Sequence, residues 1–399
     1  MANILDELKE RGLVKQVVYE DDLRELLTKE KVVCYMGFDP TADSLHIGSL
    51  ASILFLVRMQ KAGHTPIALV GGATGRIGDP TDRNDMRPMM TEEQIQHNVA
   101  SIKKQLESLF DKHCNNKLIV VNNDDWISKL SYIEMLNTVG LAMSVNRMLS
   151  FDCFKTRMEN GLTFLEFNYM PMQAYDFLHL YKKYGCVLEL GGDDQWANIL
   201  AGVELIRKKE NKPVFCMTTP LLTKADGKKM GKSASGAVWL AREKFSDYDF
   251  YQYLINVEDE KLDELFRQLT FLPLDEIKSL CSMKGQALKV AKERLAYEVT
   301  KIVRGEESAK TAQEQTRANF GGNTEDMISI SVTKQKAQNI IDLLLETKMA
   351  GSRGEAKRLI DGKGIKIDEI IIESYEYPII KPEFVLQKGK KVIQKVKLV

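Results

Sequence analysis

The sequence predicts an α/β fold in which a largely parallel sheet carries helices on both faces. The first half of the chain alternates short apolar runs with amphipathic stretches, and glycine-rich turns separate several of them. Repeated strand–helix–strand units place consecutive strands parallel and cover both faces of the sheet. The predicted strands are residues 32–38, 66–71, 117–122 and 186–190. The predicted helices are residues 47–63, 91–113, 167–183 and 194–209.

Start and stop signals support these helices and indicate where a ligand would bind. Thr91, followed by Gln94 three residues later, is suited to cap the second helix. Gly185 ends the third helix just before a strand. Ligands of such sheets bind beyond the carboxyl ends of the strands, so the functional loops should start there. These loops begin near Asp39, Gly71 and Gly191.

The pattern changes near residue 246, where strands stop and amphipathic helices follow. These helices are predicted at 247–256, 258–268, 274–283 and 287–303. Beyond a linker, two short helices are predicted at 334–348 and 352–361, with strands at 365–367, 370–372, 384–386 and 392–397. The predicted domains are an α/β domain at 1–223, a mobile loop and linker at 224–245, a helical domain at 246–320, a linker at 321–332 and a small α+β domain at 333–399.

Composition argues against several classes of protein. The hydrophobic fraction of 44% is ordinary for a globular protein, and no apolar run is long enough to span a bilayer. Residues 1–9 are charged and amphipathic, unlike a signal peptide. The six cysteines form no Cys-x-x-Cys pair, so neither a zinc site nor a disulfide framework is indicated. Reduced thiols fit a cytoplasmic protein.

Charge is unevenly distributed although the formal net charge is zero. Residues 334–399 hold 14 Lys and Arg against 9 Asp and Glu, a net charge of +5, so the remainder carries −5. A basic tail on an acidic body favours a local surface for RNA or phosphate. A simple solvated surface explains the charge equally well.

The segment 35–49 leaves a predicted strand and enters a predicted helix. A helix amino terminus offers unpaired N–H groups and the positive end of a dipole, which suit phosphate. Gly48 would let a nucleotide approach the backbone, and Thr41 and His46 could donate to phosphate oxygens. Considered alone, His46 would more simply be a surface histidine in a turn.

The segment 70–83 is a second glycine-rich turn after a strand, but it is not a Walker motif because no Gly-Lys-Ser/Thr follows. Asp79 precedes a proline and should lie in an extended loop, where its carboxylate could bind an ammonium group. A plain surface turn would fit the glycines alone.

Three polar side chains share one face of the helix predicted from residue 167. Tyr169, Gln173 and Asp176 are spaced i, i+4 and i+7. A helix face that carries a phenol, an amide and a carboxylate is poorly suited to the hydrophobic core, because burying each group without a hydrogen bond costs a few kcal/mol. This face is expected either to line a binding site for a small polar ligand or to be exposed to solvent.

The segment 191–196 lies at a strand end and opens a helix. Asp194 could accept hydrogen bonds from ribose hydroxyls, although Asp193 or Asp194 would serve equally as a helix N-cap.

The segment 222–236 combines four lysines with three glycines and is expected to be mobile and cationic. Such a loop can close over a polyphosphate and offset the charge on leaving pyrophosphate. A P-loop is excluded because Gly227 lies one residue too close to Gly231 and no apolar strand directly precedes it. A solvated lysine loop is the remaining alternative.

Together, these five strings resemble class I aminoacyl-tRNA synthetases of the bacterial tyrosyl type, in order and nearly in spacing. Residues 46–49 resemble the HIGH signature, and residues 229–233 resemble KMSKS. The resemblance runs from about Leu5 to the carboxyl terminus and implies a Rossmann-like catalytic domain followed by a helical anticodon-side domain. Residues 352–368 resemble a small RNA-binding domain shared with a ribosomal protein.

The resemblance implies a role for each matching residue. Tyr35 and Asp176 should bind the phenol of tyrosine, and Asp79, Tyr169 and Gln173 its ammonium group. Catalytic contacts to the phosphates and pyrophosphate are implied for Thr41, His46, Arg83, Arg87, Lys229 and Lys232. ATP binding is implied for Asp39, Gly48, Ser49, Gly192, Asp194, Gln195 and Lys232. RNA binding is implied for Arg353, Lys357 and Arg358.

The implied reaction is activation of L-tyrosine with ATP, followed by transfer to tRNA(Tyr). Magnesium would arrive with ATP, with no dedicated metal site and no tightly bound cofactor. A homodimer is implied, with residues 124–157 as the interface. Two departures stand out: Ser49 replaces the second histidine of HIGH, and Gly231 replaces the first serine of KMSKS. The alternatives are a noncatalytic RNA-binding relative and a tryptophan-activating one.

Overall fold

The computed structural model describes residues 3–81, 89–114, 118–233, 236–320, 329–379, 381–389 and 392–399. The chain divides into two compact units, Met1–Gly305 and Glu306–Val399, and each is considered by itself. The finer domain boundaries predicted from the sequence stay predictions.

A six-stranded sheet in the order β1-β6-β5-β2-β3-β4 forms the centre of the first unit. Its strands are β1 (Gln16–Val17), β2 (Val33–Phe38), β3 (Thr65–Val70), β4 (Ile119–Asn122), β5 (Cys186–Gly192) and β6 (Phe215–Thr219). Every neighbouring pair is parallel except β1 and β6, which are antiparallel. The predicted α/β fold is therefore confirmed. Two strands were not predicted from the sequence: β1, which has only two residues, and β6, which ends in two threonines.

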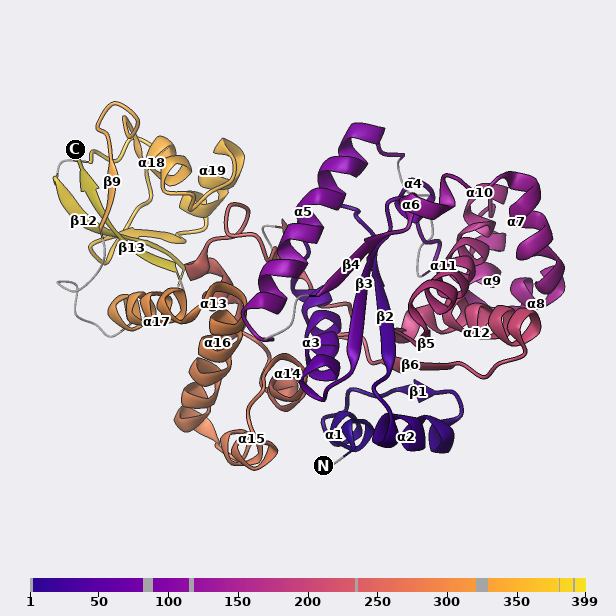
Figure 1. Ribbon diagram of the computed structural model, residues 1–399. Helices are drawn as coiled ribbons and strands as arrows, with labels where there is room; N and C mark the ends of the chain where they lie inside the picture. Colours follow the sequence, from indigo (N-terminus) through magenta and orange to yellow (C-terminus); the bar gives the residue numbers. More distant parts are fainter. Residues whose placement is uncertain are drawn as a thin grey trace. The chain divides into compact units, whose positions relative to one another are not determined.

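Helices cover both faces of this sheet (Figure 1). One face carries α3 (Ile47–Lys61) and α5 (Glu92–Asp111), and the other carries α11 (Tyr169–Tyr184) and α12 (Trp196–Glu210). Thr91 and Gln94 form the expected capping box at the start of α5. Gly185 ends α11 with a φ of 63°, a left-handed conformation that glycine adopts without steric cost.

Short helical elements connect β4 to α11. They are α6 (Asp124–Ile127), α7 (Tyr132–Thr138), η1 (Gly140–Ala142), α8 (Val145–Ser150), α9 (Asp152–Glu159) and α10 (Phe164–Phe167). Arg157 in α9 binds Glu166 in α10 through two nitrogens, and both residues are buried. None of these short helices was predicted from the sequence.

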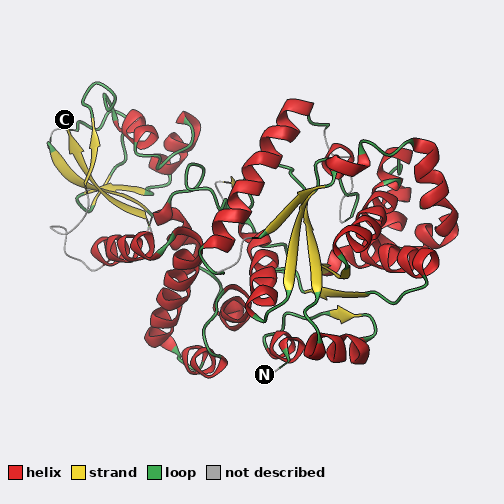
Figure 2. Cartoon of the chain, in the orientation of Figure 1, coloured by secondary structure: helices red, strands yellow, loops and turns green. Residues whose placement is uncertain are grey.

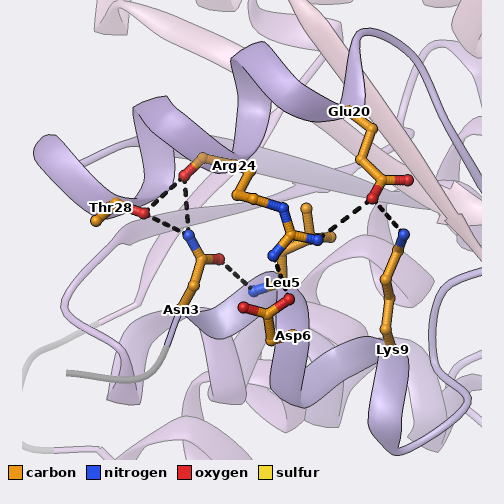
Figure 3. Close-up of polar contacts among 7 residues, drawn as sticks. All are labelled: Asn3, Leu5, Asp6, Lys9, Glu20, Arg24 and Thr28. Carbon is orange, nitrogen blue, oxygen red and sulfur yellow. Dashed lines mark hydrogen bonds and ion pairs between the residues drawn. The ribbon is translucent and has the colours of Figure 1, made fainter.

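Polar contacts link the amino-terminal helices α1 (Ile4–Glu10) and α2 (Glu20–Lys29) (Figure 3). The amide of Asn3 donates to the carbonyl of Arg24 at 2.8 Å, while its oxygen accepts from the Leu5 N–H at 2.8 Å. Arg24 also pairs with Asp6. Exposed ion pairs of this kind add little stability.

From α13 onward the first unit is helical (Figure 2). Its helices are α13 (Asp247–Ile255), η3 (Asp259–Lys261), α14 (Leu262–Leu269), α15 (Leu274–Cys281), η4 (Gly285–Ala287) and α16 (Leu288–Arg304). Buried Arg58 of α3 donates to the carbonyls of Gln268 and Thr270 at the end of α14. These hydrogen bonds connect the helical part of the unit to α3, which packs on the sheet.

The second unit begins with α17 (Glu306–Phe320), which the sequence analysis did not separate from the preceding helices. It adds α18 (Ile340–Glu346), α19 (Arg353–Asp361) and a sheet in the order β11-β10-β12-β13-β9. The strands are β9 (Ser329–Val332), β10 (Ile365–Ile367), β11 (Ile370–Ile371), β12 (Glu383–Lys388) and β13 (Val392–Leu398). The predicted start of the helix at residue 334 is wrong, because Asn339 is extended and caps α18 by accepting from the Asp342 N–H.

Candidate active site

A cleft of about 820 Å³ opens at the carboxyl ends of β2, β3 and β5, where the sequence placed the functional loops. It brings together residues from all five motifs. The predicted site residues that line it are Tyr35, Asp39, Thr41, His46, Gly48, Ser49, Asp79, Tyr169, Gln173, Asp176, Gly192, Asp194, Gln195 and Lys229. Arg83 and Arg87 fall outside the described residues, and for Lys232 only the backbone, in β7 (Lys232–Ser233), is described.

One end of the cleft holds Tyr35 of β2 and Asp176 of α11, both almost fully buried. Asp176 accepts hydrogen bonds from the amide of Asn123 at 2.9 Å and from the indole nitrogen of Trp126 at 2.7 Å. Burial nevertheless raises the pKa of Asp176 to about 7. Burial and the nearby carboxyls of Glu189 and Asp176 raise the pKa of Tyr35. This end of the cleft therefore presents a hydroxyl and a carboxyl, spaced closely enough to influence each other.

Sequence reasoning missed three residues of this environment: Asn123, Trp126 and Glu189. Asn123 directly follows β4, and that position at a strand end was the one signal that could have identified it. Glu189 lies inside β5 and is buried, and its Oε1 accepts from the Gln173 amide at 3.0 Å. Burial raises the pKa of Glu189 to about 8.

Two carboxylates line the middle of the cleft. Asp39 accepts from the Tyr169 hydroxyl at 2.9 Å and from Thr74 at 2.9 Å. Asp79 accepts from the Gln195 amide at 2.6 Å. The resemblance implies ATP contacts for Asp39 and Gln195. In the structure, however, Asp39 binds Tyr169 and Gln195 binds Asp79, and both of these partners are expected to hold an ammonium group.

The other end of the cleft lies over the amino terminus of α3. His46 is the N-cap of this helix, and its Nδ1 accepts from the Gly48 N–H at 3.0 Å. A Cβ on Gly48 would lie 2.7 Å from the His46 ring and 2.9 Å from the Met230 carbonyl oxygen, so no side chain fits. Ser49 lies in the first turn of the helix, with its N–H donating to the His46 carbonyl at 2.8 Å.

The lysine-rich segment folds back over this helix end as a hairpin. The Met230 N–H donates to the Leu222 carbonyl at 2.7 Å. Lys229 forms an ion pair of 2.9 Å with Asp194 across the cleft. Gly231 has a φ of 137°, and a Cβ there would lie 3.1 Å from His46 Nδ1. The KMSKS-like and HIGH-like segments are thus in contact.

The fold and the cleft are those of a class I aminoacyl-tRNA synthetase. Residues 27–321 match the family model for class I tRNA synthetases of tryptophan and tyrosine, and the chain belongs to this family.

Individual relatives cover the whole chain. A tyrosine–tRNA ligase of Acetivibrio thermocellus is 49% identical over 409 residues, covering 100% of both sequences. One from Clostridium botulinum strain Hall is 50% identical over 405 residues, covering 99% of each. Among solved structures, a carboxyl-terminally truncated mitochondrial tyrosyl-tRNA synthetase of Aspergillus nidulans is 30% identical with a TM-score of 0.72, covering 80% of this chain and 95% of its own.

Proposed function

We propose that this chain is a tyrosine–tRNA ligase. It activates L-tyrosine with ATP to give tyrosyl-adenylate and then transfers the tyrosyl group to the 3′ end of tRNA(Tyr). The observation that carries this proposal is that Tyr35 and Asp176 both line the buried end of the cleft, close enough for Asp176 to affect the pKa of Tyr35. Relatives named tyrosine–tRNA ligase, 49% and 50% identical over nearly the full length, support the same activity.

The buried pair selects a phenol. A phenol hydroxyl both donates and accepts, so Asp176 can accept its proton while Tyr35 donates to its oxygen. Phenylalanine would leave both groups unpaired in a buried site, which is a heavy penalty. Enzymes that activate tyrosine are a standard example of such rejection, about 10⁵-fold against phenylalanine without editing. An indole only donates, which disfavours the tryptophan-activating alternative.

The middle of the cleft orients the reacting carboxylate. Asp79, Tyr169 and Gln173 hold the ammonium group, with Asp39 fixing the Tyr169 hydroxyl. The substrate carboxylate then attacks the α-phosphorus in line, and the bond to pyrophosphate breaks. The attacking group is already an anion, so no strong general base is required and catalysis consists of positioning and charge stabilisation.

ATP enters as its magnesium complex at the α3 end of the cleft. Thr41 and His46 face the γ-phosphate, and Lys229 offsets charge on the leaving pyrophosphate. Arg83, Arg87 and Lys232 are proposed to share that charge, and Gly48, Ser49, Gly192 and Asp194 to position the adenosine. Since Lys229 and Asp194 pair with each other, ATP must replace this contact with phosphate and ribose contacts.

In the second step the terminal ribose hydroxyl of tRNA attacks the carbonyl carbon and releases AMP. Arg353, Lys357 and Arg358 are exposed on α19 and are proposed to contact RNA phosphates. The retained cleft and the full-length relatives argue against a noncatalytic RNA-binding role. The tRNA substrate makes the cytoplasm the proposed compartment. No helix in the described part of the chain combines the length and hydropathy needed to cross a bilayer.

A second copy of the chain is the proposed partner of the predicted interface at residues 124–157, which we extend here to the end of α10 at Phe167. Large apolar side chains are exposed there, and a monomer rarely leaves so many on one segment. They are Tyr132, Ile133, Leu136, Leu141, Val145, Met158, Phe164 and Leu165. Leu141, which is 81% exposed, offers the sharpest test, because Leu141→Asp should shift a dimer toward monomer in light scattering.

Amino-acid-dependent ATP–pyrophosphate exchange tests the function directly. Exchange should depend on tyrosine and fall to background with phenylalanine or tryptophan. Tyrosylation of tRNA(Tyr) should follow in the presence of ATP. Exchange driven by tryptophan, or none with tyrosine, would reject the proposal.

A further inference from the structure

Glu189 occupies a buried position directly behind the wall of the cleft. Its side chain belongs to β5, and the residue is 1% exposed. In the sheet, Tyr35 of β2 and Cys216 of β6 are its Cα partners on either side. Partners on neighbouring strands point to the same face, so the three side chains form one row beneath the cleft. Among the described residues, Tyr35 lines the cleft and Glu189 does not.

The carboxyl group of Glu189 touches two elements of the proposed tyrosine site. Oε1 accepts the Gln173 amide at 3.0 Å. Oε2 and the Tyr35 hydroxyl are both buried, and neither makes a hydrogen bond of ordinary geometry within the described structure. The two groups are nevertheless close enough for each to shift the pKa of the other.

A glycine in the neighbouring helix makes room for this carboxyl. A Cβ on Gly202 of α12 would lie 3.2 Å from Glu189 Oε2 and 3.0 Å from the Phe177 ring. The space is therefore shaped around the acid. Burying an acid beside another unpaired polar atom lowers the stability of the fold. Because stability does not account for such an arrangement, it favours a role for Glu189 in the function of the site.

We propose that Glu189 is a positioning residue for tyrosine, which orients the Gln173 amide and the Tyr35 hydroxyl at the same time. This inference rests on the proposed function. In the protonated acid, Oε1 accepts from Gln173 while the Oε2 hydroxyl donates to the oxygen of Tyr35. The Tyr35 proton is then directed at the oxygen of the substrate phenol, and Asp176 accepts the phenol proton.

The protonation state of Glu189 decides which way the Tyr35 hydroxyl points. Burial keeps the pKa of Glu189 at about 8, with Tyr35 and Gln173 lowering it and Asp176 raising it. Burial, and to a smaller extent the charge of Glu189, raises the pKa of the Cys186 and Cys216 thiols. Once ionised, Glu189 can only accept, so the Tyr35 proton turns toward it and away from the substrate. Tyrosine affinity should therefore fall above about pH 8.

Equilibrium binding of labelled tyrosine without ATP, from pH 6 to 9.5, tests the inference on the full chain. Glu189→Leu should weaken binding by roughly 10- to 100-fold at pH 7, because Gln173 and Tyr35 lose their partner. Glu189→Gln keeps an acceptor for Gln173 and a donor for Tyr35. Its tyrosine affinity should be within about threefold of wild type. Loss of the proton from the substrate ammonium group should still lower the affinity at high pH, but the further decline caused by ionisation of Glu189 should be absent.

Glu210→Gln, at the surface end of α12, is the matched control and should follow wild type at every pH. Thermal unfolding confirms that each variant is folded. Wild-type affinity in Glu189→Leu, or the same alkaline decline in Glu189→Gln as in wild type, would overturn the inference. Tyrosine binding without pyrophosphate exchange in wild type would instead reject the proposed function while leaving the Glu189 comparison valid.

Discussion

The indole nitrogen of Trp126 donates a hydrogen bond of 2.7 Å to Oδ1 of Asp176. The two residues are 50 positions apart, one in the short helix α6 and the other in α11. With Asn123 on Oδ2, this bond fixes the Asp176 carboxyl while leaving lone pairs for a substrate. The orientation of the proposed phenol site thus depends on a turn that carries none of the recognised motifs.

Replacing Trp126 with phenylalanine should weaken tyrosine binding selectively. The ring stacked on His179, at 4.3 Å between centroids, is largely retained, but the donor to Asp176 is lost. A hydrogen bond to a charged group contributes about 1.5–3 kcal/mol, so the KM for tyrosine should rise by roughly 10-fold or more. The KM for ATP in pyrophosphate exchange should change little. Asp125→Asn, on the exposed side of α6, is the control, and equal tyrosine KM values in the two variants would contradict this role.

Lys229→Met tests the charge proposed to act on pyrophosphate. Removing one preorganised charge from a developing anion typically lowers kcat by about 10²–10³-fold. Tyrosine binding without ATP should be unaffected, because Lys229 contacts Asp194 at the nucleotide end of the cleft. Lys212→Met, an exposed lysine between α12 and β6, serves as the control. A kcat within a few-fold of wild type would show that Lys229 does not stabilise the transition state.

Gly231→Ser restores the serine typical of the KMSKS signature and should nevertheless reduce activity. The φ of 137° and the 3.1 Å approach to His46 leave no comfortable place for a side chain. Backbone strain of this kind costs about 1–3 kcal/mol, so exchange should slow by roughly 5- to 100-fold. Gly227 also has a positive φ, 78°, but has open space around it, so Gly227→Ser controls for strain alone. Equal losses in both variants would mean that the His46 contact is unimportant.

The buried carboxyl of Glu189 should make stability depend on pH in a defined direction. Burial raises its folded-state pKa to about 8, above the value of about 4.3 for an unfolded chain. The protonated form therefore favours folding, and that contribution is complete below about pH 4 and is lost as pH rises through 8. Glu189→Gln cannot ionise and should gain in melting temperature over wild type between pH 5 and 8.5.

The expected gain is a few kcal/mol at most, since each pKa unit corresponds to about 1.4 kcal/mol. Burial also raises the pKa of Asp176 to about 7, so part of the pH dependence persists in the variant. Parallel melting curves for wild type and Glu189→Gln across this range would argue that Glu189 is ionised throughout.

Local patterns in the sequence were enough to predict the alternation of strands and helices, and with it the sheet edge where the motifs meet. Hydrophobic period and capping residues are local properties, so the capping box of α5 and the glycine end of α11 were predictable. The segments that contain His46, Asp79, Tyr169 and Lys229 were predictable for the same reason, because each is a continuous string. The short strand β1 and the late start of α18 were not, since neither has a local pattern of its own.

The surroundings of those motifs depend on how distant elements pack together. Glu189 looks like an ordinary residue of a strand until β2, β6, α11 and α12 close around it and remove it from water. Trp126 and Gln195 form hydrogen bonds to Asp176 and Asp79, which lie far away along the chain. Burial and long-range hydrogen bonding depend on the packing of whole elements, and no local pattern in the sequence encodes them.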